Sequence, residues 1–319
     1  MSVLSKPYFH DEAKAFEYLE SVLWADGVVC PHCGVVGGRV YSLEGVRGKA
    51  SGKSPEGAIR HGLKKCGECR QQFTVKVGTV FEHGRMPLNK MLQAVYLMTC
   101  SKKGISAHQL HRVLEISYKA AWFLEHRIRE AMRSGQLAPF GGDGGVVEVD
   151  ETFIGRREGV KKPRGGQRHM IPVLSLVHRE SGQCRSFVVD RVTRDELVPI
   201  VLQNVDHETY IMTDESGIYR GQFRPIFLGH GVVNHSAGEY GRGRVHTNTV
   251  EGSFSIFKRG MKGVYQHCSE KHLHRYVAEF EFRYNNREAL GCGDAERSRN
   301  ALKSVVGKRL TYQTANRQA

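Results

Sequence analysis

The chain has no segment typical of export or of membrane insertion. Its first residues lack the basic-then-apolar order of a signal peptide, and no apolar run approaches the roughly 20 residues that span a bilayer. Acidic residues are also outnumbered, because 33 Asp and Glu stand against 47 Lys and Arg, a formal net charge of +14. These features predict a cytoplasmic protein with no membrane partner. The excess of positive charge favours a polyanionic partner such as DNA.

The length and composition are those of a folded chain with more than one domain. Its 319 residues, 40% of them hydrophobic, give room for about two domains with their own cores. Charge alone does not separate a DNA-binding protein from a ribosome-associated or merely basic one. The motifs must therefore decide.

Four of the eight cysteines form two pairs with the spacing of metal ligands. Cys30-Pro-His-Cys33 and Cys66-Gly-Glu-Cys69 can each turn two thiolates toward one tetrahedral ion. In a chain without an export signal, thiols or metal ligands are favoured over disulfides. We predict a structural Zn²⁺ in a zinc ribbon over 29–82, with two unrelated thiol pairs or a redox motif as the weaker alternative. The other cysteines, Cys100, Cys184, Cys268 and Cys292, are expected to be ordinary buried or half-buried thiols.

The predicted ribbon has an unusually long segment between its cysteine pairs. Much of this excess is Gly, Ser and Lys over 45–62, which we interpret as a flexible insertion at a hairpin tip. After the second pair, the alternation of Gln72 to Gly78 predicts a strand.

Helical periodicity dominates the segments on either side of the ribbon. Within 1–28, an amphipathic helix is predicted over Glu12 to Trp24, and 83–140 is predicted to hold helices between Pro87 and Met132. Ser106 and Ser117 can each begin a helix, and the short turn between these helices suggests a helix-turn-helix. Its last helix would offer Lys119, Arg127 and Arg129, with Tyr118 and His126, to DNA. A helical bundle that connects two domains is the alternative.

We interpret the glycine-rich stretch from Gly141 to Gly145 as a linker between domains, because a different pattern follows it. Over 145–290 the sequence predicts a mixed sheet flanked by helices, and 291–319 is left as a C-terminal tail. The predicted strands and the intervening helix are, in order, Val146 to Gly155, Met170 to Arg179, Cys184 to Val192, a helix from Asp195 to Val205 capped at Thr193, Thr209 to Thr213, and His230 to Asn234. The fold class is therefore mixed, α+β or α/β.

Three acidic residues stand out in this second region. Asp150 and Asp214 each come at the expected end of an apolar strand, where a metal ion and a polyanion can reach them. Glu251 lies on a predicted helix whose buried residues are Val250, Phe254, Phe257 and Met261. The exposed face of that helix would carry Asn248, Glu251 and Lys258, with Arg259 beside them. We expect nearby His230, His235 and His246 to make polar or phosphate contacts rather than to bind metal.

This set of groups suits phosphodiester chemistry. Such reactions use two Mg²⁺ ions roughly 3.5 to 4 Å apart, one activating the attacking oxygen and one stabilising the leaving oxygen. Mg²⁺ takes few protein carboxylates, because water and phosphate supply its other ligands. Asp150, Asp214 and Glu251 would hold the metal, and Lys258, two helical turns after Glu251, would hold phosphate.

Several phrases of the sequence resemble the DDE transposases of bacterial insertion sequences, in the branch with an N-terminal zinc ribbon. They are Glu148-Val149-Asp150-Glu151-Thr152, Thr213-Asp214-Glu215-Ser216, Val233-Asn234-His235-Ser236, His246-Thr247-Asn248-Thr249-Val250-Glu251-Gly252, and Phe282-Arg283-Tyr284-Asn285-Asn286-Arg287. The resemblance extends over nearly the whole chain.

The resemblance implies a ribonuclease H-like catalytic domain, recognition of terminal inverted repeats, and cleavage and rejoining of DNA. By position, Asp150, Asp214 and Glu251 correspond to the three catalytic carboxylates and Lys258 to the basic residue that follows. Asn248 is a second candidate for the third place, because some members have Asn there. We prefer Glu251, since an anionic oxygen binds Mg²⁺ better than an amide. The partners would be element ends and target DNA, bound by a homo-oligomer.

Two other functions remain open from the sequence. One is a DNA-binding regulator, with zinc ribbon and helix-turn-helix, whose second domain is inactive. The other is a structure-selective nuclease that cuts junctions without joining ends. Loss of Mg²⁺-dependent cleavage in Asp150→Asn, with DNA binding intact, would separate the transposase from the regulator.

Overall fold

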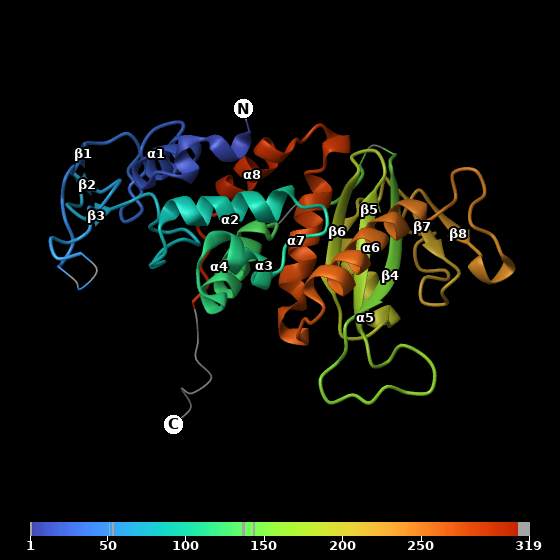
Figure 1. Cartoon of the computed structure of the whole chain (residues 1–319). Helices are drawn as coiled ribbons and strands as arrows, with labels where there is room; N and C mark the ends of the chain where they lie inside the picture. Colours follow the sequence, from blue (N-terminus) through green and yellow to red (C-terminus); the bar gives the residue numbers. More distant parts are fainter. Residues whose placement is uncertain (1, 51, 53, 136–137, 143, 312–319) are drawn as a thin grey trace, which may run out of the picture. The chain divides into compact units, whose positions relative to one another are not determined.

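A computed structural model describes residues 2–50, 52, 54–135, 138–142 and 144–311 of the chain. It contains two units, which we call the ribbon unit (residues 1–101, 105–132 and 293–319) and the sheet unit (residues 102–104 and 133–292). Figure 1 labels the elements of both. Among the described residues, no helix is long and apolar enough to cross a membrane.

The cysteine-containing part of the ribbon unit is a small antiparallel sheet. Its strands are β1 (Val40–Ser42), β2 (Lys64–Cys66) and β3 (Gln72–Phe73), in the order β1-β2-β3. The predicted strand from Gln72 to Gly78 is therefore too long. After Phe73 the backbone closes turns instead, because the amides of Val77 and Thr79 donate to the carbonyls of Thr74 and Lys76.

The segment between β1 and β2 is more ordered than a flexible insertion. Its backbone extends the hairpin, with Leu43 N–H donating to Leu63, Gly48 N–H to Ala58, and Arg60 N–H to Val46. Residues 51 and 53, at the tip, lie outside the described part. Backbone hydrogen bonds between its two sides therefore order this segment, which its glycine-rich composition did not predict.

Helices form the rest of the ribbon unit. The prediction of a helix from Glu12 is confirmed, and its first turn is capped by Asp11, which accepts the Lys14 N–H at 2.8 Å. The two serines predicted to begin helices do so: Ser106 accepts the Gln109 N–H and Ser117 the Ala120 N–H, both at 3.2 Å. The helices are α1 (Glu12–Leu23), α2 (Leu88–Cys100), α3 (Ala107–Leu114) and α4 (Tyr118–Met132), with short 3₁₀ turns at Val3–Ser5 and Pro7–Phe9.

The segment after residue 290, expected to be a tail, contains a helix of the ribbon unit. This helix, α8 (Asp294–Lys303), packs against α1, α2 and α4. Ala301 and Leu302 are buried, and the Arg297 guanidinium donates to the Thr99 carbonyl at 3.2 Å. Its buried residues, Arg297, Ser298, Ala301 and Leu302, include only one large apolar side chain, so its periodicity is weak in the sequence.

The sheet unit is built on five strands in the order β6-β5-β4-β7-β8 (Figure 1). β5 pairs antiparallel with β4 and β6, whereas β7 pairs parallel with β4 and β8. The strands are β4 (Val146–Ile154), β5 (Ile171–His178), β6 (Gln183–Val188), β7 (Tyr210–Asp214) and β8 (Gly229–Val233). The prediction of a mixed sheet flanked by helices is confirmed, and this strand order gives a ribonuclease H-like fold.

Helices cover both faces of this sheet. One core contains Val147 and Val149 of β4 with Leu197 and Val201 of α5 (Arg194–Asn204). On the other face, α6 (Asn248–Gly260) contacts β4 and β5 and α7 (Leu273–Asn285) contacts β6, as Figure 1 shows. Because successive strand residues point to opposite faces, Glu148 and Asp150 lie on the α6 face. Short 3₁₀ or π-helical turns occupy His235–Ala237, Met261–Tyr265, Glu270–His272 and Glu288–Leu290.

The sheet unit begins before the glycine-rich stretch that we expected to link two domains. Phe140 is buried in the core that includes Val149, and its amide donates to the Asn204 carbonyl at 2.8 Å. The Asp206 amide donates in turn to the Phe140 carbonyl at 2.7 Å. A single aromatic residue ahead of several glycines thus anchors the start of this unit. Residue 143 lies outside the described part.

Candidate functional site

The four predicted cysteine ligands meet in the ribbon unit. The sulfur atoms of Cys30, Cys33, Cys66 and Cys69 all lie within 4.8 Å of one another. Two of their separations are 3.6 Å, between Cys30 and Cys69, and 3.8 Å, between Cys33 and Cys66. A tetrahedral zinc ion with Zn–S bonds of about 2.3 Å needs sulfurs about 3.8 Å apart. The cluster therefore fits a zinc ion, and the prediction of a four-cysteine zinc ribbon is confirmed.

The surroundings of the cluster favour thiolate at one of these ligands. Burial opposes ionisation of Cys30, but hydrogen bonds from the backbone amides of Cys33 and His32 outweigh it and lower the pKa of its thiol to about 7. Cys30 and Cys66 are fully buried against Phe73. A preformed set of four sulfurs, with two of the cysteines fully buried, is typical of a structural zinc site rather than a catalytic one.

Asp150 lies in the middle of β4, which corrects its predicted position at a strand end. The antiparallel pairing of β4 with β5 continues to Ile154, but its parallel pairing with β7 stops at Glu148, which is opposite Met212. Asp214, as predicted, is the last residue of β7. Asp150 therefore lies two residues past the last pair that β4 makes with β7, while its own strand continues. The sequence could not show this, because β4 pairs with β5 as far as Ile154 but with β7 only as far as Glu148.

The structure brings the three predicted carboxylates into one electrostatic neighbourhood. Burial, with added repulsion from Asp214 and Glu251, raises the pKa of Asp150 to about 7, against lowering contributions from the Glu151 amide and His235. Among the described residues, however, the cysteines are the one tight group of metal-ligating side chains. Asp214 and Glu251 are thus near enough to Asp150 to affect its ionisation, but the three carboxylates do not form a group as tight as that of the cysteines.

Glu251 is held at the start of α6. Its Oε1 accepts a hydrogen bond from the Thr247 hydroxyl at 2.9 Å and lies 3.4 Å from His235 Nε2. The side chain of Glu251 remains 43% exposed, so it can take further ligands. His235 thus contacts a predicted metal ligand, a role that its residue type alone did not reveal.

The other predicted residues of α6 divide between its buried face and its accessible side. The prediction of a buried stripe is confirmed, since Val250, Phe254 and Phe257 are buried. Asn248 is the exposed first residue of the helix, and Lys258 is half-buried with its ammonium 6.0 Å from the centre of the Phe254 ring. Arg259 is exposed, and its Nε donates to the Ser255 carbonyl at 3.1 Å. Glu251, Lys258 and Arg259 are therefore all accessible along one helix.

Two further acidic residues next to the predicted ligands have structural partners. Glu151 accepts a hydrogen bond from the Tyr219 hydroxyl on the α5 face, and burial, with added repulsion from Asp150 and Asp214, raises its pKa to about 8. Glu215 accepts the backbone amides of Ser236 at 2.9 Å and His235 at 2.8 Å, and these bonds lower its pKa to about 2. Glu151 and Glu215, each of which directly follows a predicted ligand, thus have pKa values shifted in opposite directions.

Sequence reasoning also missed the role of Glu148. Its side chain is fully buried, although it lies in a strand that otherwise reads as apolar. Its carboxylate accepts from Arg179 Nε at 2.5 Å and from the backbone amides of Thr249 and Val250 at 2.8 and 2.9 Å. Strand alternation could have found it, because Glu148 shares the face of Asp150.

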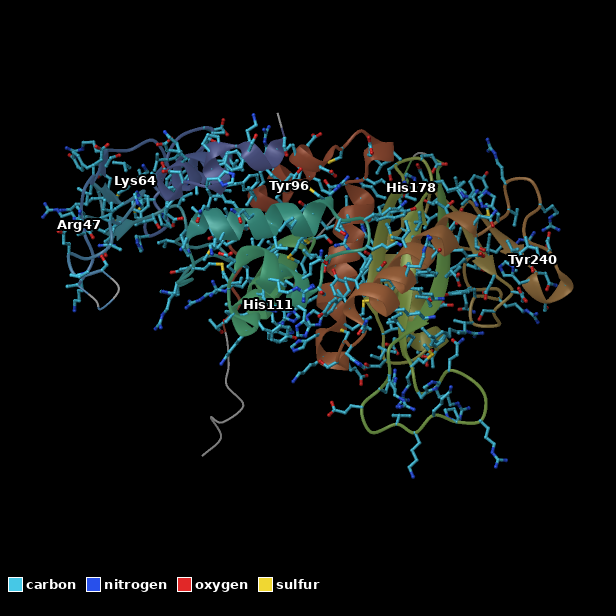
Figure 2. The ribbon with its side chains drawn as sticks, in the orientation of Figure 1. Arg47, Lys64, Tyr96, His111, His178 and Tyr240 are labelled. Atoms are coloured by element: carbon cyan, nitrogen blue, oxygen red, sulfur yellow. The ribbon has the colours of Figure 1, made fainter. Side chains whose placement is uncertain are left out.

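The helix pair α3 and α4 carries the residues that we expected to contact DNA. Lys119 and Tyr118 are exposed, and the Tyr118 ring stacks on His108 with ring centroids 4.4 Å apart. His111, labelled in Figure 2, is also close to the Tyr118 ring, at 6.3 Å. An exposed group of aromatic, imidazole and ammonium side chains therefore marks the junction of the two helices.

Two of the predicted DNA contacts on α4 are corrected by their burial. Arg129 is fully buried and pairs with Glu125 at 3.1 Å, so its guanidinium neutralises an internal carboxylate. His126 is buried as well. Arg127 is half-buried and donates to the Glu82 carbonyl at 2.9 Å. In the sequence, a charged residue on the buried face of a helix cannot be distinguished from one on its exposed face. Only the packing of the folded chain shows which is buried.

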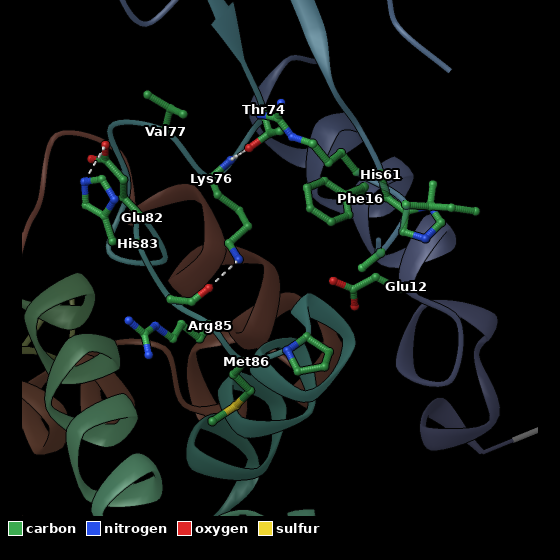
Figure 3. Close-up of a pocket in the computed structure, with 15 residues that line it drawn as sticks. Glu12, Phe16, His61, Thr74, Lys76, Val77, Glu82, His83, Arg85 and Met86 are labelled. Carbon is green, nitrogen blue, oxygen red and sulfur yellow. Dashed lines mark hydrogen bonds and ion pairs between the residues drawn. The ribbon is translucent and has the colours of Figure 1, made fainter. Parts of the chain in front are cut away.

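A cavity of about 590 Å³ opens beside the zinc ribbon (Figure 3). Basic side chains on its wall include His61, Lys76 and Arg85. Lys76 donates to the Gly84 carbonyl at 3.1 Å, and its burial lowers its pKa. Glu12, also on the wall, accepts the amides of Leu88 and Asn89 and so caps α2. Glu12 is thus committed to a helix end, and with Glu82 also on the wall the cavity has both basic and acidic side chains.

A ribonuclease H-like sheet with grouped carboxylates, together with a four-cysteine ribbon, defines the class of DNA-processing transposases. Comparison with protein families supports this. Residues 143–285 match the ISXO2-like transposase domain, and residues 10–72 match the transposase zinc-ribbon domain. The chain belongs to the DDE transposases of insertion sequences that carry an N-terminal zinc ribbon.

Individual relatives are consistent with the family. The chain is 27% identical over 308 residues to an uncharacterized protein in transposable element ISH50 of Halobacterium salinarum, covering 88% of this chain and 95% of that protein. Among solved structures, a chain of the simian T-cell lymphotropic virus intasome in complex with PP2A regulatory subunit B56 gamma aligns over 60% of this chain and 65% of its own length. Its identity is 15% and its TM-score 0.30, a likeness too slight to support an inference.

Proposed function

We propose that the chain binds the terminal inverted repeats of an insertion sequence and catalyses Mg²⁺-dependent cleavage and strand transfer at the element ends. The observation that carries the proposal is the match of residues 143–285 to a transposase domain in which Asp150, Asp214 and Glu251 come together from two strands and a helix. Convergence of acids so distant in sequence is costly unless a cation compensates their repulsion.

Each predicted group has a separate role in this reaction. Asp150, Asp214 and Glu251 would hold two Mg²⁺ ions, which when bound supply an activated oxygen nucleophile and charge stabilisation at the scissile phosphate. Lys258 and Arg259, on the accessible side of α6, would hold the DNA backbone. We propose Glu251 rather than Asn248 as the third ligand, because an anionic oxygen binds Mg²⁺ better than an amide oxygen.

The ribbon unit would recognise the element ends. Lys119, at the exposed start of α4, and the half-buried Arg127 remain candidates for phosphate contact. Arg60 and Arg85, on the wall of the cavity beside the ribbon, add positive charge to the same unit. Because cleavage and joining require two ends together, we propose that the chain acts as a homo-oligomer on element and target DNA.

The test uses Asp150→Asn and Lys119→Ala in the full chain with an element-end DNA. We expect Asp150→Asn to lower Mg²⁺-dependent cleavage at least 100-fold with binding unchanged, because it removes a metal ligand without altering the ribbon unit. Lys119→Ala should weaken binding by about tenfold or less and reduce its salt dependence by about one charge.

The outcomes separate the alternatives. Binding without cleavage in the unchanged chain would favour a regulator with an inactive second domain. Cleavage of branched DNA without joining would favour a structure-selective nuclease. Full cleavage by Asp150→Asn would show that the acids have been assigned wrongly.

A further inference from the structure

The start of α6 has an unusual cap. The residue in the N-cap position is Thr247, but its hydroxyl donates to Glu251 instead of accepting an amide of the first turn. Helix starts leave several amides without an intrahelical partner, and the N-cap side chain normally accepts one of them. α6 therefore needs an acceptor from elsewhere.

That acceptor is Glu148, from the middle strand of the sheet. Its Oε2 accepts the amides of Thr249 at 2.8 Å and Val250 at 2.9 Å, the two positions that an N-cap side chain would serve. Its Oε1 also accepts the Thr249 hydroxyl at 2.8 Å. The carboxylate at the helix start is additionally favoured by the positive end of the helix dipole.

A second set of contacts fixes Glu148 itself. Arg179, just after β5, donates through Nε to Glu148 Oε1 at 2.5 Å. Its Nη1 and Nη2 donate to the carbonyls of Arg244 and His246, both at 2.7 Å, in the segment that leads into α6. His246 Nδ1 lies 3.2 Å from Glu148 Oε1. β4, the end of β5 and the approach to α6 are thus joined at one buried carboxylate.

We propose that Glu148 is a positioning residue that sets the location of Glu251 relative to Asp150. Glu148 and Asp150 are two residues apart on one face of one strand, so the strand fixes their relative position. By accepting the first-turn amides of α6, Glu148 fixes the helix start in the same frame. It also leaves the Thr247 hydroxyl available to hold Glu251. This inference rests on the proposed metal-dependent function.

The physical consequence concerns metal affinity rather than the chemical step. A Gln at position 148 has one acceptor oxygen, and its amide group would face the Arg179 or backbone donors without accepting from them. The start of α6 would then adopt the competent position in a smaller fraction of molecules. Because the apparent dissociation constant rises as this fraction falls, more metal is needed, but saturating metal restores the competent state.

The experiment measures Mn²⁺ binding by electron paramagnetic resonance and Mg²⁺-dependent cleavage, both on the zinc-loaded full chain. For Glu148→Gln we expect the Mn²⁺ midpoint to rise by about 10-fold or more, the size typical for residues that orient metal ligands. Cleavage at saturating Mg²⁺ should stay within about threefold of the unchanged chain. Hydrogen exchange at the Thr249 and Val250 amides should become faster.

Two further variants keep the test decisive. Thr249→Val removes the hydroxyl donor to Glu148 without leaving a buried charge unpaired, and it should raise the midpoint in the same direction by a smaller factor. Glu281→Gln is the matched control, because Glu281 is a carboxylate of the same unit that accepts the Ser186 amide and the Ser134 hydroxyl. It should leave the Mn²⁺ midpoint unchanged.

The inference would be overturned by an unchanged midpoint in Thr249→Val and Glu148→Gln, or by an equal rise in Glu281→Gln. A rate loss that saturating Mg²⁺ does not recover would also overturn it, because that outcome indicates general damage. Asp150→Asn distinguishes the underlying function: if it binds Mn²⁺ as the unchanged chain does, the proposed metal site fails whatever Glu148→Gln shows.

Discussion

The cysteine cluster of the ribbon unit and the acidic group of the sheet unit are built in opposite ways. The four sulfurs lie within 4.8 Å of one another on adjoining turns and strands, and two of the cysteines are fully buried. The acids come from β4, β7 and α6, and the side chain of Glu251 is 43% exposed. A metal that only holds a fold needs a closed set of ligands, whereas a metal that meets DNA needs an open one.

The two regions also differ in what holds their ligands in place. The cysteines are positioned by short local turns, so close sequence spacing is enough to bring each pair together. The acids depend on contacts between distant segments, such as those from Glu148 to the start of α6. We therefore expect damage at the first region to unfold its surroundings, and damage at the second to alter function with the fold intact.

The largest effect should follow from removing a cysteine ligand. Cys66→Ser should lose the bound zinc and destabilise the ribbon by an amount on the order of 5 kcal/mol, since whole structural zinc sites contribute roughly 10 to 16 kcal/mol. Zinc content and limited proteolysis over 29–82 measure this. Cys184→Ser, a buried thiol of the sheet unit with Ser186 Oγ 3.4 Å away, is the control and should retain zinc. If Cys66→Ser retained its zinc, the cysteine cluster would not be the closed ligand set that we contrast with the acidic group.

Asp150→Asn should change the free energy of unfolding by a smaller amount and in the opposite direction, because it should stabilise the zinc-loaded chain in the absence of Mg²⁺. Burial and neighbouring carboxylates raise the pKa of Asp150 from 3.8 to about 7 in the folded state. Between these values the folded chain holds a proton that the unfolded chain releases, so stability falls as pH rises through this window. Asn removes that loss, and at pH 8 we expect a gain of about 1–3 kcal/mol.

Thermal unfolding at pH 5 and pH 8 measures this gain. The gain should be small at pH 5 and larger at pH 8, because the carboxylate is mostly protonated in the folded chain only at the lower pH. Asp190→Asn is the control, since Asp190 is exposed and its substitution should change stability by no more than about 0.5 kcal/mol. An equal gain at both pH values would show that charge is not the cause.

The sequence predicted best where function depends on local spacing. The cysteine pairs, the helix starts at Ser106 and Ser117, and the buried stripe of α6 are all determined within a few residues, and the structure confirms them. The placement of Asp150 within β4 and the burial of Arg129 were predicted wrongly. Both depend on which segments pack against them, and one chain's sequence does not state its tertiary partners.

The same reason explains why Glu148 went unassigned. It was visible in the sequence as a charged residue within an apolar strand, but its partners Thr249 and Val250 are about a hundred positions away. A buried carboxylate without a partner is unfavourable, so its presence in a strand already required distant donors. The sequence thus indicated that such donors exist without identifying them.

The smallest effect should come from Glu151→Gln, although Glu151 adjoins Asp150. Successive strand residues point to opposite faces, so Glu151 lies on the α5 face, where its carboxylate accepts a hydrogen bond from the Tyr219 hydroxyl, and is poorly placed to bind a metal ion held by Asp150. Gln keeps the acceptor for the Tyr219 hydroxyl. We expect cleavage at pH 7 to stay within about threefold of the unchanged chain, against at least about 100-fold loss in Asp150→Asn. If Glu151→Gln lowered cleavage as much as Asp150→Asn, both neighbouring acids would bind the metal. The acidic group of the sheet unit would then include a fourth carboxylate ligand.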